Sequence, residues 1–244
     1  MKLVIEDDYA ALSRTTAAVL VGAMLQDRRV NLSLTAGATP AGAYQLLAPL
    51  LAARGGDIAD VHFYNFDEIP NGTPRGVTRT SLDNELYGPA AIDEANIHGL
   101  TLDNVEEIRA DLFQHGGLDL VLMGLGGDCH FCGNMPGVTR FDRDIYVYDI
   151  HPDLPWYSLV ESMGDPAPEQ VVTFGAPMIL RAKQAVLIVS GTSKAEALAE
   201  ILTGPIGEDR PGTILRTHPN LLLIADREAA ALIESDGAGG WRRR

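Results

Sequence analysis

Short apolar runs alternate with segments of helical periodicity along this chain. The clearest run, Leu118 to Leu125, is almost continuously apolar, which is typical of a strand covered on both faces of a parallel sheet. Between such runs, apolar residues spaced three or four apart predict helices, the first of them over Asp7 to Gln26. This alternation, which contains no internal repeat, predicts an α/β fold built on a doubly wound sheet.

The remaining predicted elements continue this alternation of strands and helices. Strands are predicted at 30–34, 61–66, 144–150, 171–174, 185–190 and 221–225. Helices are predicted at about 40–53, 79–87, 105–115, 177–182 and 193–202, with a last helix that ends near 234. Residues 235–244 contain three glycines and a terminal arginine run, so we expect one domain over 1–234 and a flexible tail after it.

Composition narrows the class of protein. A formal charge of −14 over 244 residues argues against a nucleic-acid or anionic-membrane surface, because such surfaces rest on many lysines and arginines. Only Cys129 and Cys132 are present, which fits a reducing compartment. Three acidic residues at 6–8 interrupt what would be the apolar part of a signal peptide, and no run approaches the roughly 20 apolar residues of a membrane span. A cytoplasmic protein is therefore expected.

Two glycine-containing turns combine features of a phosphate site. Residues 35–40 place glycine before a predicted helix, with Thr39 as its expected N-cap. Later in the chain, the spacing of Ser193 and Glu196 predicts a capping box, which puts Lys194 in the first turn of a helix. A cation there loses roughly 0.3 to 1 kcal/mol against the helix dipole, and a bound anion would reverse that sign. The alternatives are a plain helix cap and an exposed lysine.

Two carboxylates end the second predicted strand. Asp67 and Glu68 follow the largely apolar or aromatic run His62 to Phe66. Because strand side chains alternate in direction, one of the two leans toward the crevice at the edge of the sheet. A partly desolvated carboxylate in that crevice can act as a general base toward a proton on carbon. The alternative is a solvated acidic turn.

The central strand runs directly into a polar turn with the sequence Gly126-Gly-Asp-Cys-His-Phe-Cys132. A carboxylate and an imidazole beyond the carboxyl end of a strand predict general acid–base chemistry by Asp128 and His130. Four alternatives stand beside it: a redox pair of cysteines, a zinc site, a dinucleotide-binding turn that begins at Gly124, and a buried Asp–His pair without a catalytic role. The dinucleotide turn lacks its third glycine, and no fourth zinc ligand is evident nearby.

Four segments together resemble the glucosamine-6-phosphate deaminase and 6-phosphogluconolactonase superfamily in order and spacing: TAGATP (35–40), NFDE (65–68), LGGDCHFCGN (125–134) and VSGTSKA (189–195). The resemblance spans roughly residues 30–230. It implies a single α/β domain with a mostly parallel, Rossmann-like sheet, helices on both faces and no cofactor or metal. Members of the superfamily are often oligomers, so a homo-oligomer is also expected.

The resemblance further implies roles for individual residues. Four of them would hold the substrate phosphate: Gly37, Ala38, Thr39 and Lys194. Asp67 would move a proton between C1 and C2 of the sugar, and His130, oriented by Asp128, would help to open the sugar ring. Glu68 and Asn134 are further candidates for contact with the substrate.

Several positions depart from the family's pattern. Met135 stands where deaminases have the glutamate of an Asn-Glu-Pro motif, and a thioether cannot carry a proton. Cys129 replaces a glycine, and Gly133 replaces an aromatic residue of deaminases. No arginine between Tyr146 and Gln170 matches the one that supports the phosphate in deaminases. The Asp-Glu pair also lacks the arginine that usually follows it in lactonases, which favours the deaminase branch.

We therefore predict a sugar-phosphate enzyme similar to glucosamine-6-phosphate deaminase, which converts an aldose to a ketose with release of ammonia. The runner-up is lactone hydrolysis of the 6-phosphogluconolactonase type, with His130 activating water, because hydrolysis suffers less from the loss of one acid. Isomerisation of another phosphosugar is a further alternative. A phosphosugar sensor without catalysis would keep Thr39 and Lys194 and would not need Asp67.

Overall fold

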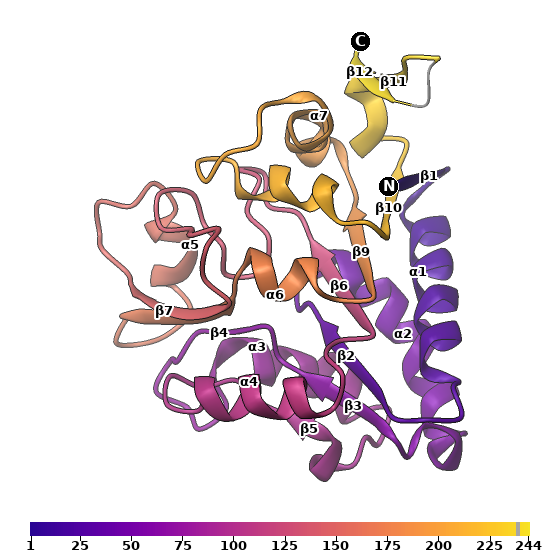
Figure 1. Cartoon of the computed structure of the whole chain (residues 1–244), viewed down its shortest axis with the longest axis vertical. Coiled ribbons are helices and arrows are strands. Elements are labelled where there is room, and N and C mark those ends of the chain that lie inside the picture. The colour runs from indigo at the N-terminus through magenta and orange to yellow at the C-terminus, as the bar shows by residue number, and fades with distance from the viewer. Residues whose placement is uncertain (238–239) are drawn as a thin grey trace.

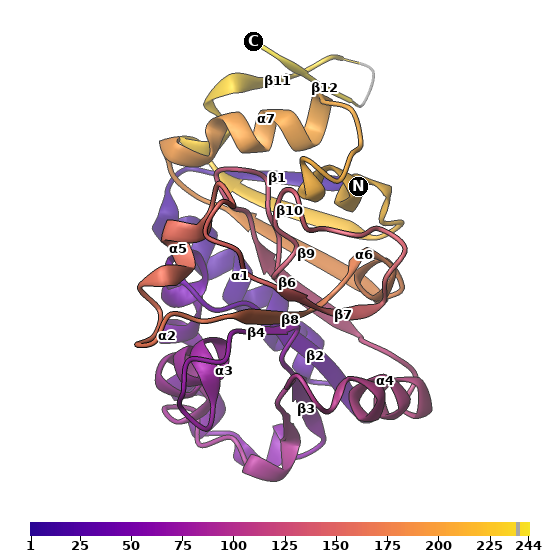
Figure 2. The ribbon, with the colours of Figure 1, turned by 90° about the vertical axis from the view of Figure 1, so that its left-hand side faces the viewer.

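A seven-stranded parallel sheet forms the centre of the computed structural model, which describes residues 1–237 and 240–244 (Figures 1 and 2). In spatial order its strands are β1 (Lys2–Glu6), β10 (Leu221–Asp226), β9 (Gln184–Val189), β6 (Leu120–Gly124), β2 (Val30–Leu34), β3 (Val61–Tyr64) and β5 (Ile97–His98). From β2 the chain adds strands on one side, and from β6 it adds them on the other. Ligands bind open α/β sheets at such a reversal, beyond the carboxyl ends of the strands.

Helices cover both faces of this sheet, as predicted. The first face carries α1 (Tyr9–Met24) and α2 (Ala38–Ala52), whereas the second carries α4 (Val105–Gln114), α6 (Ala176–Leu180) and α7 (Ala195–Thr203) (Figure 1). The strand side chains alternate between the two cores: Leu120 and Leu122 of β6 pack toward α1 and α2, and Val121 and Met123 pack on the opposite face. The predicted fold class is therefore confirmed.

Two predicted strands lie outside the main sheet. β7 (Ile145–Asp149) and β8 (Gln170–Phe174) pair antiparallel, and β4 (Asp67–Glu68) pairs antiparallel with β8. The prediction that residues 144–150 and 171–174 belong to the single doubly wound sheet was wrong. The side chains of β7 alternate between buried and more exposed, which distinguishes it from the strands of the main sheet. Strands of a parallel sheet are covered on both faces, whereas an antiparallel strand can leave one face in water. This small sheet begins at the predicted base, Asp67, and so joins the site.

Two strands and the C-terminal region differ from the prediction. The edge strands β1 and β5 were not predicted, and the last predicted helix is only a 3₁₀ turn over Ala229–Leu232. β11 (Ile233–Ser235) then pairs antiparallel with β12 (Trp241–Arg243), as Figure 2 shows. The division of the chain at residue 234 and the flexibility of 235–244 stay predictions.

The predicted helix over 79–87 is split into α3 (Gly76–Leu82) and a π turn (Asp83–Tyr87). The other short elements are α5 (Tyr157–Glu161) and 3₁₀ turns at Gly55–Ile58, Glu94–Asn96, Thr192–Lys194 and Pro211–Thr217. Within residues 1–237 and 240–244, no helix combines the length and the apolar character needed to cross a bilayer.

Candidate active site

A cavity of about 510 Å³ lies where the turns after β2, β3, β6 and β9 meet, at the reversal of strand order. The opposite wall comes from the loop over 130–135, from β7 and β8, and from the region of α5. Six of the nine predicted site residues line this cavity: Gly37, Ala38, Thr39, Asp67, His130 and Lys194. Residues separated by more than 150 positions in sequence are thus brought together at one edge of the sheet.

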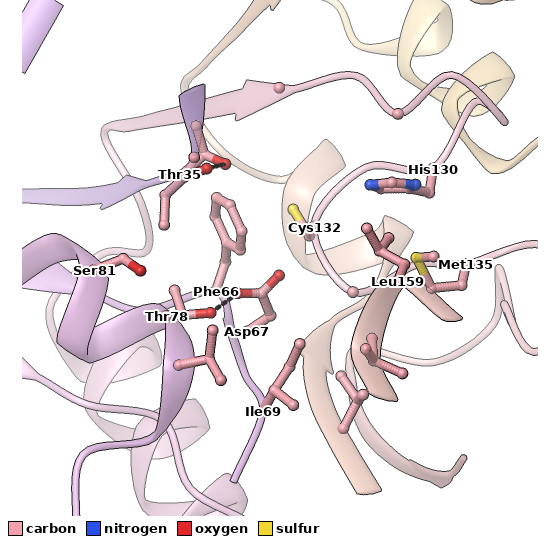
Figure 3. Close-up of a pocket in the computed structure, with 18 of the residues that line it drawn as sticks. Thr35, Phe66, Asp67, Ile69, Thr78, Ser81, His130, Cys132, Met135 and Leu159 are labelled. Carbon is pink, nitrogen blue, oxygen red and sulfur yellow. Dashed lines mark hydrogen bonds between the residues drawn. The ribbon is translucent and has the colours of Figure 1, made fainter. Parts of the chain in front are cut away.

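Asp67 is the carboxylate that faces the cavity. The Thr78 hydroxyl donates a hydrogen bond of 2.8 Å to its Oδ1, drawn as a dashed line in Figure 3. Thr78 and Ser81 lie on one side of the carboxylate, and His130, Met135 and Leu159 lie on the other (Figure 3). Burial raises the pKa of Asp67 to about 7; the Thr78 bond opposes this effect, and the charge of Glu68 adds to it. A carboxylate with such a pKa accepts and returns protons near neutral pH.

Glu68 points away from the cavity and anchors α3. Its buried carboxylate accepts hydrogen bonds from the backbone N–H groups of Ile69 (3.0 Å), Thr78 (2.7 Å) and Arg79 (2.9 Å). Gly76, at φ +67°, lies directly over it, and a Cβ at that position would approach its Oε1 to 2.5 Å. Glu68 does not line the cavity, so its predicted contact with the substrate remains a prediction that this geometry does not support.

Asp128 holds the His130 ring in place at the rim of the cavity. The imidazole Nδ1 lies 2.6 Å from Asp128 Oδ1, so Nδ1–H donates to the carboxylate and Nε2 is left for a substrate. Burial alone would raise the pKa of Asp128, but the hydrogen bond and charge of His130 hold it below its usual value. Gly126 makes the pairing possible, since a Cβ there would approach Nδ1 to 2.1 Å. The side chains of His130 and Asp128 are 26% and 38% exposed, so the pair is only partly buried, and whether it is catalytic stays a prediction.

The phosphate end of the cavity differs in detail from the prediction. α2 begins at Ala38 and its N-cap is Gly37, at φ +114°, so the expectation that Thr39 caps the helix was wrong. Glycine takes this position because the backbone there adopts a positive φ. In the described part of the chain no side chain caps the helix, so the N–H groups of Ala38 and Thr39 in its first turn remain available to an anion.

Lys194 lies at the N-terminal boundary of α7. It is the last residue of the 3₁₀ turn Thr192–Lys194 and the N-cap of α7, and the predicted capping box of Ser193 and Glu196 is not formed. Glu196 pairs with Arg243 instead, at 2.9 Å. Within residues 1–237 and 240–244, the Lys194 ammonium makes no hydrogen bond or ion pair, although it lines the cavity. An unpaired cation beside an open helix end fits an anionic ligand.

Buried Asp226 fixes the turn that carries Lys194. Its carboxylate accepts hydrogen bonds from the Ser190 hydroxyl (2.5 Å), from the Gly191 N–H (3.0 Å) and from the Ala229 N–H (2.8 Å). The turn is thus held from the end of β10 and does not depend on a ligand for its shape.

The wall opposite these turns is apolar. Six of its residues have aliphatic, thioether or aromatic side chains: Met135, Trp156, Leu159, Val160, Met163 and Val171. Met135 is only 5% exposed and belongs to a small cluster with Trp156 and Val171. The polar atoms of the two aromatic side chains on this wall are hydrogen-bonded to the backbone. Trp156 Nε1 donates to the Pro136 carbonyl (2.9 Å), and the Tyr148 hydroxyl donates to the Gly133 carbonyl (2.8 Å). The position of the deaminase glutamate is therefore part of an apolar core.

The two cysteines do not resemble a redox pair. Cys129 is buried at φ +70°, a backbone conformation that favours glycine, and its thiol lies 3.8 Å from the Ala197 carbonyl. Cys132 lines the cavity at φ +49°. Burial raises the pKa of both thiols, whereas redox pairs rely on a lowered one. Among the residues that the structure describes, no three His, Cys, Asp or Glu side chains are placed to hold a metal.

Gly133 and Asn134 support the small sheet. A Cβ on Gly133 would lie 2.8 Å from Thr173 Cβ, so the aromatic residue of deaminases has no room here. The buried Asn134 amide donates to the Phe174 carbonyl (2.8 Å) and accepts from the Tyr146 hydroxyl (3.1 Å). Asn134 does not line the cavity, and its contact with a substrate stays a prediction.

Sequence reasoning missed two groups of cavity residues. Thr78 and Ser81 offer hydroxyls from α3, but a hydroxyl in a helical segment carries no signal of a site. The apolar wall comes from the irregular, proline-containing segment around α5, whose composition is typical of any packed loop.

Comparison with known proteins gives a consistent result. A family model for glucosamine-6-phosphate isomerases/6-phosphogluconolactonase matches residues 6–223. A glucosamine-6-phosphate deaminase of Alkaliphilus metalliredigens is 29% identical over 252 aligned residues, which cover 96% of this chain and 100% of that protein. The one from Shouchella clausii is also 29% identical, with 95% and 97% covered.

Solved structures agree with this result. A monomeric glucosamine-6-phosphate deaminase matches with a TM-score of 0.80 at 26% identity, over 95% of this chain and 100% of that one. A 6-phosphogluconolactonase from Trypanosoma cruzi matches with a TM-score of 0.72 at 19% identity, over 94% and 96%, which shows the same fold.

Proposed function

The chain belongs to the glucosamine-6-phosphate isomerase/6-phosphogluconolactonase family, and on that premise we propose that it is an enzyme that moves a proton between neighbouring carbons of a phosphorylated sugar. The reaction is of the deaminase type, in which an aldose is converted to a ketose with release of ammonia from an aminosugar phosphate. The observation that carries this proposal is the Asp67 carboxyl, which lies in the cavity with a pKa raised to about 7, in the same space as His130 and the unpaired Lys194.

The phosphate binds between the start of α2 and Lys194. The open N–H groups of the first helical turn and the ammonium together supply the donors and the positive charge that a phosphate dianion needs. The sugar carbons then extend past Asp67 toward His130, which lies across the cavity from Thr78 and Ser81 (Figure 3). Binding at the phosphate end thus orients the carbons that react.

Asp67 acts as the base at carbon. It takes the proton from C2, the electron pair of that bond forms the C1=C2 double bond of the enolamine, and His130, carrying a proton on each ring nitrogen, delivers the Nε2 proton to O1. Asp67 then returns its proton to C1 while the lone pair of the nitrogen on C2 forms a C2=N bond. Water adds to this iminium, and ammonia leaves as the C2 ketone forms. His130 can do this because Asp128 holds its Nδ1 side.

Lactone hydrolysis is the second candidate. One observation favours it: Asp128 orients His130 at the rim of the cavity, and an imidazole oriented in this way can activate a water without help from another acid. In that reaction Asp67 would have no role at carbon.

Proton NMR in D2O separates the two reactions. Glucosamine-6-phosphate and 6-phosphogluconolactone are incubated separately with the native protein, with Asp67→Asn and without enzyme. The proposal predicts deuterium incorporation at C2, or ammonia release, that disappears in Asp67→Asn. Lactone opening faster than the blank and equal in both proteins, with no exchange at C2, would assign the chain to the hydrolase reaction instead.

The other predictions go with this proposal. We expect the enzyme to act in the cytoplasm without a cofactor, to bind no nucleic acid or membrane, and to form a homo-oligomer. Size-exclusion chromatography with light scattering tests the last point, on which one structural relative is described as monomeric.

A further inference from the structure

The two carboxylates of β4 lie on opposite sides of the strand and contact the same residue of α3. Asp67 lines the cavity, whereas Glu68 is buried behind it. The Thr78 hydroxyl donates to Asp67 Oδ1 (2.8 Å), and the Thr78 N–H donates to Glu68 Oε1 (2.7 Å) (Figure 3). Thr78 thus links the proposed base to the carboxylate behind it.

Glu68 supplies the N-terminal cap of α3. In the described part of the chain, the N-cap residue of this helix, Arg75, makes no side-chain capping hydrogen bond. The N–H groups of Thr78 and Arg79 in the first turn donate to Glu68 instead, at 2.7 and 2.9 Å. The position of α3, and with it the position of the Thr78 hydroxyl, therefore depends on the Glu68 carboxylate.

The hydrogen bonds of Glu68 keep it ionised. Besides the two N–H groups of α3, the Ile69 N–H (3.0 Å) and the Asn65 side-chain nitrogen (3.5 Å) donate to its carboxylate. Burial raises the pKa of Glu68, and these donors oppose that effect. A carboxylate that accepts several backbone N–H bonds is stabilised in its charged form.

No side chain neutralises the charge of Glu68. Within residues 1–237 and 240–244, Glu68 forms no ion pair, and the Arg79 guanidinium pairs with Asp83 and Glu94 instead, each at 2.7 Å. An uncompensated negative charge therefore lies one residue from the proposed base, where it disfavours the ionised form of Asp67.

Glu68 thus influences Asp67 in two opposite ways. Burial raises the pKa of Asp67 to about 7; the Thr78 hydrogen bond opposes this rise, and the charge of Glu68 adds to it. The hydrogen bond depends on Glu68 as well, because Glu68 holds α3. The other titratable side chains that line the cavity come from other elements: His130, Cys132, Tyr148 and Lys194.

We infer that Glu68 is a positioning residue for the proposed base, which acts on Asp67 through the Thr78 hydroxyl that it holds in place and through its own buried charge. This inference rests on the proposed function. It gives Glu68 a part in the reaction without the contact with the substrate that the sequence predicted, since Glu68 does not line the cavity.

Carbon NMR titration of the Asp67 carboxyl, in parallel with the pH profile of C2 exchange, tests this inference. Glu68→Asp keeps the charge but is one methylene shorter, so it should release α3 and draw the Thr78 hydroxyl away from Asp67. The pKa of Asp67 and the acid limb of exchange should then rise by roughly one unit, as in Thr78→Val, and exchange on that limb should fall about tenfold. Combining both substitutions should add no further shift, because they remove the same hydrogen bond.

Glu68→Gln tests the charge separately. In the Thr78→Val protein, which has no hydroxyl to lose, this substitution should lower the pKa of Asp67 and move the acid limb to lower pH. Glu94→Gln is the matched control, because Glu94 also pairs with α3, through the Arg79 side chain, but does not contact Glu68 or line the cavity. It should leave the titration of Asp67 unchanged.

Each part of the inference can be contradicted separately. An unchanged pKa of Asp67 in folded Glu68→Asp would overturn the link through Thr78, and no downward shift in the Thr78→Val, Glu68→Gln protein would overturn the role of the charge. If circular dichroism shows that these variants do not fold, the native protein decides: Glu68 must remain ionised while Asp67 titrates, and protonation of Glu68 at higher pH than Asp67 would contradict the inference. Absence of C2 exchange would contradict the proposed function, whereas the carboxyl titration would still decide the role of Glu68.

Discussion

The two walls of the cavity are held in different ways. The polar wall consists of turns that follow parallel strands, and buried carboxylates fix two of these turns: Glu68 secures α3 beside Asp67, and Asp226 secures the turn before Lys194. The apolar wall is held by side-chain packing around Met135 and Trp156. This difference suggests that the sheet edge positions the charges of the reaction, whereas the small antiparallel sheet and α5 give the cavity its shape.

The largest effect is expected on the polar wall. Asp67→Asn keeps the size and the Thr78 contact of the side chain but removes the base, so C2 exchange should fall by roughly 10²- to 10⁴-fold. Binding of inorganic phosphate, followed by calorimetry, should be unchanged. Asp144→Asn, an acid paired with Arg181 outside the cavity, is the matched control. Retention of exchange in Asp67→Asn would remove the carboxylate from the mechanism.

A smaller loss is expected at the phosphate end. Lys194→Ala removes a charged donor, and the KM for a phosphosugar should rise roughly 10- to 100-fold with less change in kcat, since hydrogen bonds to charged groups contribute about 1.5–3 kcal/mol. Lys183→Ala is the control, because that lysine lies outside the cavity, where its Nζ pairs with Asp119 Oδ1 at 2.7 Å. Equal KM values in the two variants would mean that phosphate binds elsewhere.

The apolar wall should respond in stability more than in chemistry. Trp156→Phe keeps the aromatic packing but removes the hydrogen bond to the Pro136 carbonyl, so the free energy of unfolding should fall by about 1 kcal/mol in a urea titration. The kcat should stay within about twofold, because no proton passes through this wall on our account. A kcat that drops tenfold without loss of stability would show that the wall takes part in the reaction.

The same contrast explains what could be predicted from sequence. Residues of the polar wall lie on strand-end turns, where glycines and charged residues follow apolar runs. This local signal led to the choice of Asp67, His130 and Lys194, which all line the cavity. Alternation alone left open which of Asp67 and Glu68 faces the cavity, because that choice depends on how α3 packs over Glu68. Structure was needed to resolve it.

Most of the missed features depend on contacts between segments that are distant in sequence. β7 and β8 were predicted as strands of the main sheet because the sequence of a strand does not specify which strands it pairs with. Trp156 lies in a segment predicted to be irregular, and only the structure shows its hydrogen bond to the Pro136 carbonyl. The predicted capping box failed in the same way, because Glu196 pairs with Arg243, 47 residues further along the chain. The cap predicted at Thr39 failed for a local reason, since Gly37 takes the N-cap position at a positive φ. The predicted fold class was nevertheless correct, because it depends on the alternation of many apolar runs and helical segments and not on any single one.

The pH profile of C2 exchange in native protein and in Thr78→Val tests the central claim, that Asp67 is the base at carbon. Exchange requires ionised Asp67, so the native rate should fall as the pH drops through about 7. The Thr78 hydroxyl favours the ionised form, so its removal should raise the pKa of Asp67 and move this acid limb to higher pH. A limb that does not move in Thr78→Val, with the protein folded and active, would assign the titration to another group and contradict the account.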